Sequence, residues 1–246
     1  MRRHDEGLHG RPWPERGAAV RRMFDEISPE YDRLNRILSA GLDRGWRRWA
    51  VRHLEGSPPG PWCDLASGTG DLALEMRSAG RAVVRCDLSS VLLRRAQEKA
   101  GIRAAHWPAA ACEMDRLPLR SASVAAVGQG FALRHCRSFA SLFGELHRVL
   151  QPGGRIALLD MRYPTDGVVG PAYRFYFRSV LPRLAGALGG DQDAYEMMVA
   201  SVRALPAESE ILRAAVDAGL TGVRSERGFL GSVRLIVGEK PRTTTA

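Results

Sequence analysis

The chain has 246 residues, of which 45% are hydrophobic, and this composition can bury one substantial core and favours a single α/β domain. Its formal net charge is +9, with a pI near 10.1, and the excess is arginine spread over segments that also carry acids. Because no basic run is interleaved with aromatic residues, the composition does not indicate a nucleic-acid-binding protein. The charge leaves two interpretations open, a solvated basic surface or attraction to anionic lipid headgroups and acidic partners.

The cysteines and the hydropathy of the chain exclude further classes of protein. No two of the four cysteines form a C-x-x-C pair, so neither a zinc site nor a disulfide framework is predicted, and we expect no metal. The first 17 residues lack an apolar signal core, and no later stretch reaches about 18 consecutive apolar residues. We therefore expect a cytoplasmic protein that is soluble or peripheral at the inner face of the membrane, with a homodimer left open.

The N-terminal part of the chain is expected to be helical. Residues 1–17 are interpreted as a flexible leader, and a helix is predicted to begin near Ala18, because apolar residues follow it at helical spacing. Pro29 interrupts this helix, and a second helix is predicted over about 44–55. Two interpretations of 18–56 stay open. The helices either pack on the edge of a sheet or form a lid over a ligand.

A tight glycine turn follows the first predicted strand and offers a site for a nucleotide-like ligand. Gly68 and Gly70 permit backbone angles closed to other residues, and the helix that follows them offers unpaired N–H groups. Asp64 can lie under the turn and receive a ligand's ammonium or the loop's own N–H groups. This acid favours S-adenosylmethionine over an NAD-type dinucleotide, although the loose G-x-G-x-x-G/A pattern fits both.

Asp87 ends the next predicted strand, 17 positions beyond Gly70. A carboxylate at this position would accept the ribose hydroxyls of either nucleoside ligand, so Asp87 supports a nucleoside without choosing between the two. The alternative is that Asp87 caps the following helix.

Strands and helices alternate through the middle of the chain, which indicates a mostly parallel sheet with helices on both faces and a ligand at the carboxyl ends of the strands. The predicted strands lie near 62–66, 81–87, 103–110, 123–129 and 155–160, and the predicted helices near 71–79, 90–100 and 138–150. Residues 164–206 break this rhythm. We interpret them as an aromatic cap whose side chains from Tyr173 to Leu184 line a path for an apolar substrate.

The last part of the chain is predicted to close the sheet. A helix over about 207–218 precedes two strands, Val223–Phe229 and Ser232–Val237, which a very short turn makes antiparallel. A seven-stranded, mostly parallel sheet with an antiparallel last strand is typical of Rossmann-like class I methyltransferases. The predicted domain is therefore 18–240, with a short tail over 241–246.

Several separate blocks of the sequence carry a family pattern. They are Met23-Phe24-Asp25, Tyr31-Asp32-x-x-Asn35, Ser39-x-Gly41 with Trp46, Asp64-Leu65-Ala66-x-Gly68-Thr69-Gly70-Asp71-Leu72, Glu113-Met114-Asp115-Arg116-Leu117-Pro118, Phe131-Ala132-Leu133-Arg134-His135 and Arg148-Val149-Leu150-x-Pro152-Gly153-Gly154. With these blocks the chain resembles the ubiquinone/menaquinone biosynthesis C-methyltransferase family, the UbiE/MenG type. The resemblance implies methyl transfer from S-adenosylmethionine to a ring carbon of demethylmenaquinol or a related prenylated quinol.

The resemblance also implies which residues bind the methyl donor. Beside Asp64 and the two loop glycines, they are Thr69, Asp87, Glu113, Met114 and Gly130. For Glu113 an exposed loop acid is the alternative. The substrate half departs from the family, because Asp160-Met161-Arg162-Tyr163-Pro164 stands where the family has Glu-Phe-Ser-Lys-Pro. An aromatic or polyketide metabolite methylated at carbon or oxygen therefore stays open as the acceptor, as does a cofactor-binding scaffold without activity.

Arg134 and His135 follow the fourth predicted strand and are candidates for activating the acceptor. Because arginine stays protonated, Arg134 is interpreted as the cation that stabilises a developing phenolate, with a structural salt bridge as the alternative. His135 stands where the family has Asn, and its ordinary pKa of about 6.5 suits a general base. It could instead replace only the hydrogen bond of that Asn. Tyr31, in the N-terminal segment, is a third candidate that would orient the substrate hydroxyl.

Overall fold

A computed structural model of the protein describes residues 13–27, 36, 39, 41–101, 107–162, 202 and 205–242. The helices and strands follow one another along the chain in the order that the sequence predicts. They are α2 (Trp13–Ile27), α4 (Asp43–Leu54), β1 (Trp62–Leu65), α5 (Asp71–Ser78), β2 (Val83–Asp87), α6 (Ser90–Ala100), β3 (Ala109–Ala111), β4 (Val124–Gly130), α7 (Phe139–Val149), β5 (Leu150–Met161), α11 (Glu208–Asp217), β6 (Thr221–Gly228) and β7 (Val233–Glu239). Two short 3₁₀ helices, Leu133–His135 and Phe229–Gly231, follow β4 and β6.

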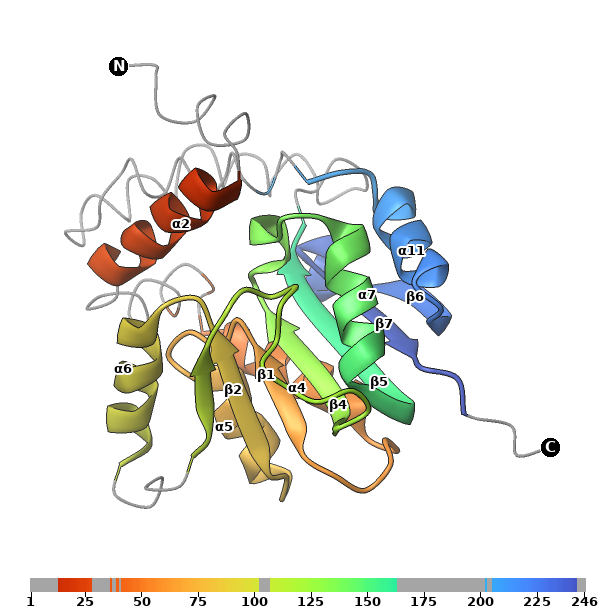
Figure 1. Cartoon of the computed structure of the whole chain (residues 1–246), viewed down its shortest axis with the longest axis horizontal. Helices are drawn as coiled ribbons and strands as arrows, with labels where there is room; N and C mark the ends of the chain where they lie inside the picture. The colour runs from red at the N-terminus through yellow and green to blue at the C-terminus, as the bar shows by residue number, and fades with distance from the viewer. Residues whose placement is uncertain are drawn as a thin grey trace.

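The strands form one seven-stranded sheet in the order β3-β2-β1-β4-β5-β7-β6 (Figure 1). Strands β1 to β5 pair in parallel, and β7 lies between β5 and β6 and is antiparallel to both. This arrangement confirms the predicted Rossmann-like fold with an antiparallel last strand. Because the strand order reverses between β1 and β4, the connections that leave their carboxyl ends run in opposite directions, at the place where such sheets bind ligands.

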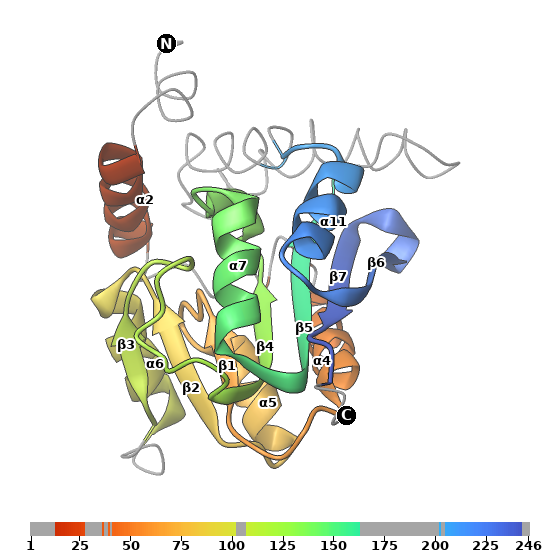
Figure 2. The same cartoon turned by 45° about the vertical axis from the view of Figure 1, so that its right-hand side comes forward.

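Helices cover both faces of the sheet, and a separate apolar cluster lies under each layer (Figure 2). On one face α4 and α5 bury Trp46, Leu54, Leu72 and Met76 against the strands. On the other face α7 and α11 bury their own apolar residues, which include Phe143, Leu146 and Ile211. The central strands are therefore buried on both sides, as expected for parallel strands that follow one another through helical crossovers.

Three boundaries differ from the sequence prediction by more than two residues. Helix α2 begins at Trp13 rather than near Ala18, because a proline is tolerated in the first helical turn and Glu15 there suits the positive end of the helix. Strand β5 begins at Leu150 rather than near 155. Of the third predicted strand, Ala109–Ala111 is a strand, and the five residues before Trp107 lie outside the described residues.

The early start of β5 follows from the glycines that were interpreted as the stop of α7. Gly153 N–H donates to the Lys240 carbonyl and Lys240 N–H donates to the Gly154 carbonyl, each over 2.8 Å. These bonds extend the pairing beyond the end of β7. The register between β4 and β5 shifts between Val124 and Ala126.

Most of the predicted cap, 164–206, lies outside the described residues, and so does Tyr31. The apolar path from Tyr173 to Leu184 and the role of Tyr31 therefore stay predictions. The N-terminal helices do not pack on the edge of the sheet as one interpretation had it, because the edge strands are β3 and β6, and the lid interpretation stays a prediction. Helix α4 packs on β4, β5 and β7, whereas α2 contacts α6 and lies beyond the carboxyl end of β2 (Figure 1).

The close approach of β4 and β5 predicts a steric requirement at Gly154. A Cβ there would lie 2.8 Å from the Gln151 carbonyl oxygen and 3.0 Å from that of Ala125, and neither backbone group can move without breaking the ladder. Gly154→Ala should therefore lower the free energy of unfolding by about 1–3 kcal/mol. Urea unfolding measures the change as a lower midpoint at an unchanged slope.

Gly144→Ala in α7 is the matched control, because a Cβ at Gly144 meets no atom within 4 Å. This substitution should stabilise the protein by about 0.5–1 kcal/mol, through the better helix propensity of alanine. A Gly154→Ala protein as stable as the wild type would contradict the close strand approach.

Candidate active site

The glycine loop joins β1 to α5 through two residues with left-handed backbone angles. Gly68 has a φ of 53° and Gly70 a φ of 82°, values that favour glycine. Gly70 N–H donates to the Ser67 carbonyl over 2.8 Å, and Gly70 caps the start of α5. A Cβ on Gly70 would lie 3.1 Å from Ala96 and from the Trp107 ring, whereas one on Gly68 would meet no described residue within 4 Å. Packing therefore requires Gly70, and the outer side of Gly68 is open.

Asp64 lies beneath this loop and is 1% exposed. Its Oδ2 accepts a hydrogen bond from Ala73 N–H over 2.8 Å, while its Oδ1 is buried without a hydrogen-bond partner among the described residues. Burial raises the pKa of Asp64 to about 8, against the opposing effects of Ala73 N–H and the Arg47 charge. A buried oxygen without a donor is satisfied by a ligand that brings one. The ammonium group of S-adenosylmethionine is such a donor, so the residues present fit this methyl donor.

Asp87 ties the glycine loop to the start of α6. Its Oδ2 accepts from Gly68 N–H over 2.7 Å and its Oδ1 accepts from Ser89 N–H over 2.8 Å. Burial raises the pKa of Asp87 to about 6, although these N–H groups favour the charged form. The cap of α6 is Ser89, whose hydroxyl accepts from Leu92 N–H, so the alternative role of Asp87 as the helix cap is wrong. Each carboxylate oxygen keeps a second lone pair that can accept a ribose hydroxyl.

The remaining predicted donor residues lie on the two loops beside these acids. Thr69 is buried in the glycine loop. Glu113 and Met114 follow β3, and the chain is held there because Cys112 N–H donates to the Asp87 carbonyl over 2.8 Å. Met114 packs against the core, and the Oε2 atom of Glu113 is buried without a hydrogen-bond partner in the described part of the chain. Glu113 is therefore not the exposed loop acid of the alternative interpretation.

Gly130 ends β4 at the point where the strand order reverses. A Cβ at Gly130 would meet only Leu72, at 4.0 Å, whereas one at Gly128 would lie 2.3 Å from the end of the Met76 side chain. Packing within the protein thus explains Gly128 but does not explain Gly130. Among the described residues only Leu72 approaches this side of Gly130, and the role of Gly130 in donor binding stays a prediction.

Arg134 and His135 lie on the 3₁₀ helix directly after β4. Arg134 Nη1 pairs with Asp160 Oδ1 over 2.8 Å, and both side chains are buried. The ion pair that was considered as the alternative role of Arg134 is therefore present. It also fixes the guanidinium at the carboxyl ends of β4 and β5. The His135 ring meets the Phe24 ring edge-on, with 5.3 Å between centroids and 88° between planes.

Helix α2 supplies two contacts to this end of the sheet that the sequence analysis did not assign to the site. Phe24 lies against His135, and Asp25 accepts a hydrogen bond from the Ser89 hydroxyl beside Asp87. Both residues belong to a sequence block that carries the family resemblance, and this block was the available signal. These contacts place α2 at the candidate site and support the lid interpretation for this helix.

Arg47 is a second functional candidate that the sequence analysis missed. It is buried in α4, pairs with Asp43, lies 3.6 Å from Asp71 at the start of α5, and has its guanidinium 5.4 Å from the centroid of the Phe131 ring. A run of arginines in a basic helix is typical of a solvated face, so the sequence offered no signal that Arg47 is buried at the site. Its charge stabilises ionised Asp64 and thereby links α4 to the glycine loop.

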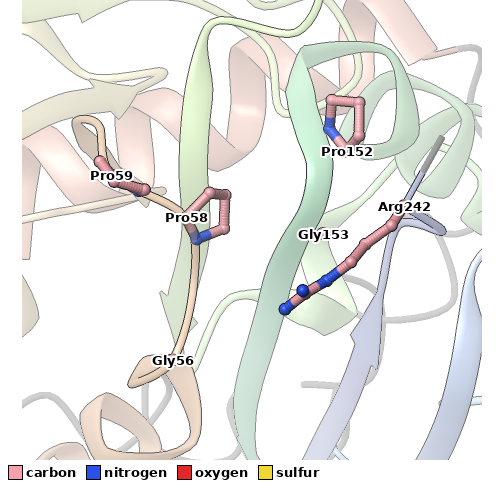
Figure 3. A pocket seen from close by; sticks show the side chains of 6 residues that line it. All are labelled: Gly56, Pro58, Pro59, Pro152, Gly153 and Arg242. Atoms are coloured by element: carbon pink, nitrogen blue, oxygen red, sulfur yellow. The ribbon is translucent and has the colours of Figure 1, made fainter. Parts of the chain in front are cut away.

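A separate cavity of about 430 Å³ lies at the opposite end of the sheet (Figure 3). Its lining residues are Gly56, Pro58, Pro59, Pro152, Gly153 and Arg242. They precede β1, begin β5 and follow β7, so the cavity lies at the amino ends of the parallel strands. Backbone, proline rings and one arginine offer no group suited to methyl transfer.

The described residues contain no group of three or more His, Cys, Asp or Glu that could hold a metal ion. The four cysteines, Cys63, Cys86, Cys112 and Cys136, are free thiols. The acids at the carboxyl ends of β1 and β2 have protein N–H groups as partners.

The buried Asp64 predicts a pH dependence of donor binding. Its pKa of about 8 keeps the carboxyl protonated in the free protein, and pairing with an ammonium group requires the ionised form. Affinity for S-adenosylmethionine should therefore fall from about pH 7.5 to about pH 5.5, with a limiting slope of about tenfold per pH unit. Titration calorimetry in buffers of different ionisation enthalpy should detect release of a proton on binding.

Asp64→Asn provides the control for this linkage, because the amide has the same shape and does not titrate. The variant should bind weakly and should lose the pH dependence between about pH 7.5 and about pH 6.5, above the pKa of about 6 of Asp87, together with the proton release measured there. Equal affinity of the wild type at both pH values would contradict the role of Asp64.

Comparison with known proteins agrees with this geometry. The model of the ubiE/COQ5 methyltransferase family matches residues 14–240. The demethylmenaquinone methyltransferase of Thermus thermophilus is 40% identical over 221 residues, which cover 89% of this chain and 100% of that protein. The ubiquinone/menaquinone biosynthesis C-methyltransferase UbiE of Syntrophotalea carbinolica is 38% identical and covers 88% of this chain and 92% of its own.

Among solved structures, a SAM-dependent methyltransferase of Thermotoga maritima has a TM-score of 0.62 at 16% identity, and the match covers 89% of this chain and 99% of the other. This likeness supports the fold. The family match spans nearly all of the described chain and includes the glycine loop, both acids and Gly130. The protein therefore belongs to the ubiE/COQ5 methyltransferase family of S-adenosylmethionine-dependent enzymes.

Proposed function

We propose that this enzyme transfers the methyl group of S-adenosylmethionine to a ring carbon of demethylmenaquinol and so forms menaquinol. The observation that carries the proposal is the 40% identity to a demethylmenaquinone methyltransferase over that protein's entire length. The site geometry supports the same chemistry, because a buried, unsatisfied carboxylate oxygen and an open glycine backbone lie where the strand order reverses.

The donor would be held by the residues on β1, β2 and the loops after β3 and β4. When bound, S-adenosylmethionine supplies an electrophilic methyl group. Asp64 would pair with its ammonium group and Asp87 would accept its ribose hydroxyls, while Gly68, Thr69 and Gly70 would line the donor with the backbone of the glycine loop. Glu113, Met114 and Gly130 would complete the contacts. The protein's task at this end is positioning, which brings the ring carbon and the methyl group together.

The acceptor would be activated by the residues after β4. Loss of the hydroxyl proton gives a phenolate, whose charge raises the electron density at the adjacent ring carbon. Arg134 would stabilise this oxyanion and His135 would take its proton. As the carbon–carbon bond forms, the carbon–sulfur bond breaks, and the hydrogen of that ring carbon then leaves as a proton. Tyr31 is kept as a residue that orients the hydroxyl.

A second acceptor class is favoured by one observation. The segment that begins at Asp160 departs from the family pattern, and Asp160 itself lies at the carboxyl end of β5 and pairs with Arg134. A polycyclic or polyketide phenol methylated at carbon or oxygen is therefore the second candidate.

We infer that the enzyme meets a lipid quinol at the membrane surface. None of the helices in the described ranges combines the length and hydropathy needed to cross a bilayer. The net charge of +9 supports attraction to anionic headgroups, and so do the exposed arginines Arg44 and Arg48 on α4, which share Glu75 as their ion-pair partner. Homodimer formation stays a prediction, which sedimentation analysis would test.

Turnover with a labelled methyl donor tests the proposed function. The enzyme should transfer the label to a ring carbon of demethylmenaquinol, and mass spectrometry with NMR of the product identifies the methylated atom. Asp87→Ala should retain its fold but lose affinity for S-adenosylmethionine by about tenfold or more, because two hydroxyls lose a charged acceptor. A preference for a tailless polycyclic phenol would favour the second acceptor class, and methylation at oxygen would overturn C-methyl transfer.

The candidate base predicts a change in the pH profile. In His135→Asn the rate should fall and the acid limb of the kcat profile should disappear, because a neutral imidazole accepts the proton and an amide cannot. His147→Asn, at the opposite end of α7, should keep the wild-type profile. An unchanged acid limb in His135→Asn, measured where chemistry limits the rate, would reduce His135 to a hydrogen-bonding residue.

A further inference from the structure

Arg234 is a buried arginine in the interior of the sheet. It lies in β7 between β5 and β6, is 5% exposed, and has the fully buried Val233 and Leu235 as its neighbours in the chain. Burial of a guanidinium is costly, and desolvation lowers the pKa of Arg234. An apolar residue would cover the sheet at this position without the desolvation cost of a guanidinium, so the buried charge itself requires an explanation.

The charge of Arg234 faces Asp160, the acid that holds Arg134. Asp160 is the register partner of Arg234 across the β5–β7 ladder, and opposite residues of an antiparallel pair project from the same face of the sheet. Asp160 is 0% exposed, and its Oδ1 accepts from Arg134 Nη1 over 2.8 Å and from Met161 N–H over 2.7 Å. Its Oδ2 and the Arg234 Nε are both buried without hydrogen-bond partners in the described ranges. The coupling between the two residues is therefore electrostatic.

Other charged groups around Arg234 come from three neighbouring elements. Glu208 at the start of α11 attracts it, and Arg162 after β5 repels it. Arg227 is its exposed register partner on β6. Among these described groups Asp160 and Arg234 are buried and the Arg134 side chain is 8% exposed, so the interactions of these three are screened little.

This arrangement matters for Arg134. A buried carboxylate paired with Arg134 alone would cancel the positive charge that the acceptor oxyanion needs. With Arg234 facing the same carboxylate, two buried cations share one anion and a net positive charge is left at the carboxyl end of β5. Arg234 thus offsets the negative charge of Asp160, the acid that positions Arg134.

We propose that Arg234 is a positioning residue for the methyl acceptor, which balances the charge of Asp160 and leaves Arg134 able to stabilise the acceptor's phenolate. The inference rests on the proposed function, because it requires an acceptor that reacts as an oxyanion. Arg234 acts through Asp160 and Arg134 and needs no contact with the substrate. A residue with only a packing role would be replaced by an apolar side chain of similar length without any effect on ionisation at the site.

Arg234→Met tests the charge. With saturating S-adenosylmethionine, kcat at neutral pH should fall by about tenfold, and the acid limb of the kcat profile should move up by about one pH unit. The dissociation constant for S-adenosylmethionine should stay unchanged. Arg234→Lys, which keeps the charge, should restore the wild-type limb. Arg224→Met on β6 is the control, because this exposed arginine carries the same charge and should leave the profile unmoved.

Asp160 supplies the opposite change. Asp160→Asn should move the acid limb down, because both arginines then act without a counter-charge, and the double variant Asp160→Asn/Arg234→Met should return it to the wild-type position. Circular dichroism and the calorimetric binding stoichiometry define the folded fraction to which each rate is referred. If Arg234→Met fails to fold, the Asp160→Asn and Arg234→Lys profiles still decide the proposal.

If the acid limb of the kcat profile keeps its wild-type pH in folded Arg234→Met, or in Asp160→Asn, the charge-balancing role is overturned. Failure of the proposed function is recognised separately and first, because the wild type would then not methylate demethylmenaquinol at all. In that case the same variants are compared on the phenolic acceptor that the wild type does methylate.

Discussion

Two buried carboxylates hold the donor end of this protein in shape. Asp64 and Asp87 lie at the ends of neighbouring parallel strands, and each accepts a backbone N–H of the segment between β1 and the first turn of α5. These bonds fix the path of the glycine loop from both sides. Burial raises the pKa of both acids, so their charged forms depend on the N–H donors around them. The lone pairs that the backbone leaves unused are the ones a ligand can satisfy.

The donor half could be predicted from sequence because its geometry is local. A parallel sheet places the carboxyl ends of its strands on one edge, so an acid at each strand end and a glycine turn after the first are enough to predict neighbours in space. Asp64, Gly68 and Asp87 lie as this rule requires. The antiparallel last strand followed from the short turn before β7, whereas the sequence analysis made no prediction of the strand order.

The charged network of the acceptor half depends on contacts between distant segments, which no local pattern encodes. Asp160 pairs with Arg134 from 26 positions away, and Asp25 meets Ser89 from 64 positions away. Arg234 alternates with apolar residues and so looks like the polar face of an exposed strand. It is buried because other parts of the chain cover both faces of β7. Boundary errors had a similar origin, since only the contacts of Gly153 and Gly154 with the chain after β7 show that the β5 pairing continues through them.

The single open oxygen of Asp64 also bears on how the enzyme releases its product. The ammonium group that this oxygen suits is carried by S-adenosylmethionine and equally by the S-adenosylhomocysteine left after transfer. A contact made alike before and after the reaction lowers the free energy of both bound states and leaves the barrier between them unchanged. The contact affects the occupancy of the donor site, because it holds S-adenosylhomocysteine as firmly as S-adenosylmethionine. The same buried carboxylate that holds the glycine loop thus favours product inhibition by S-adenosylhomocysteine.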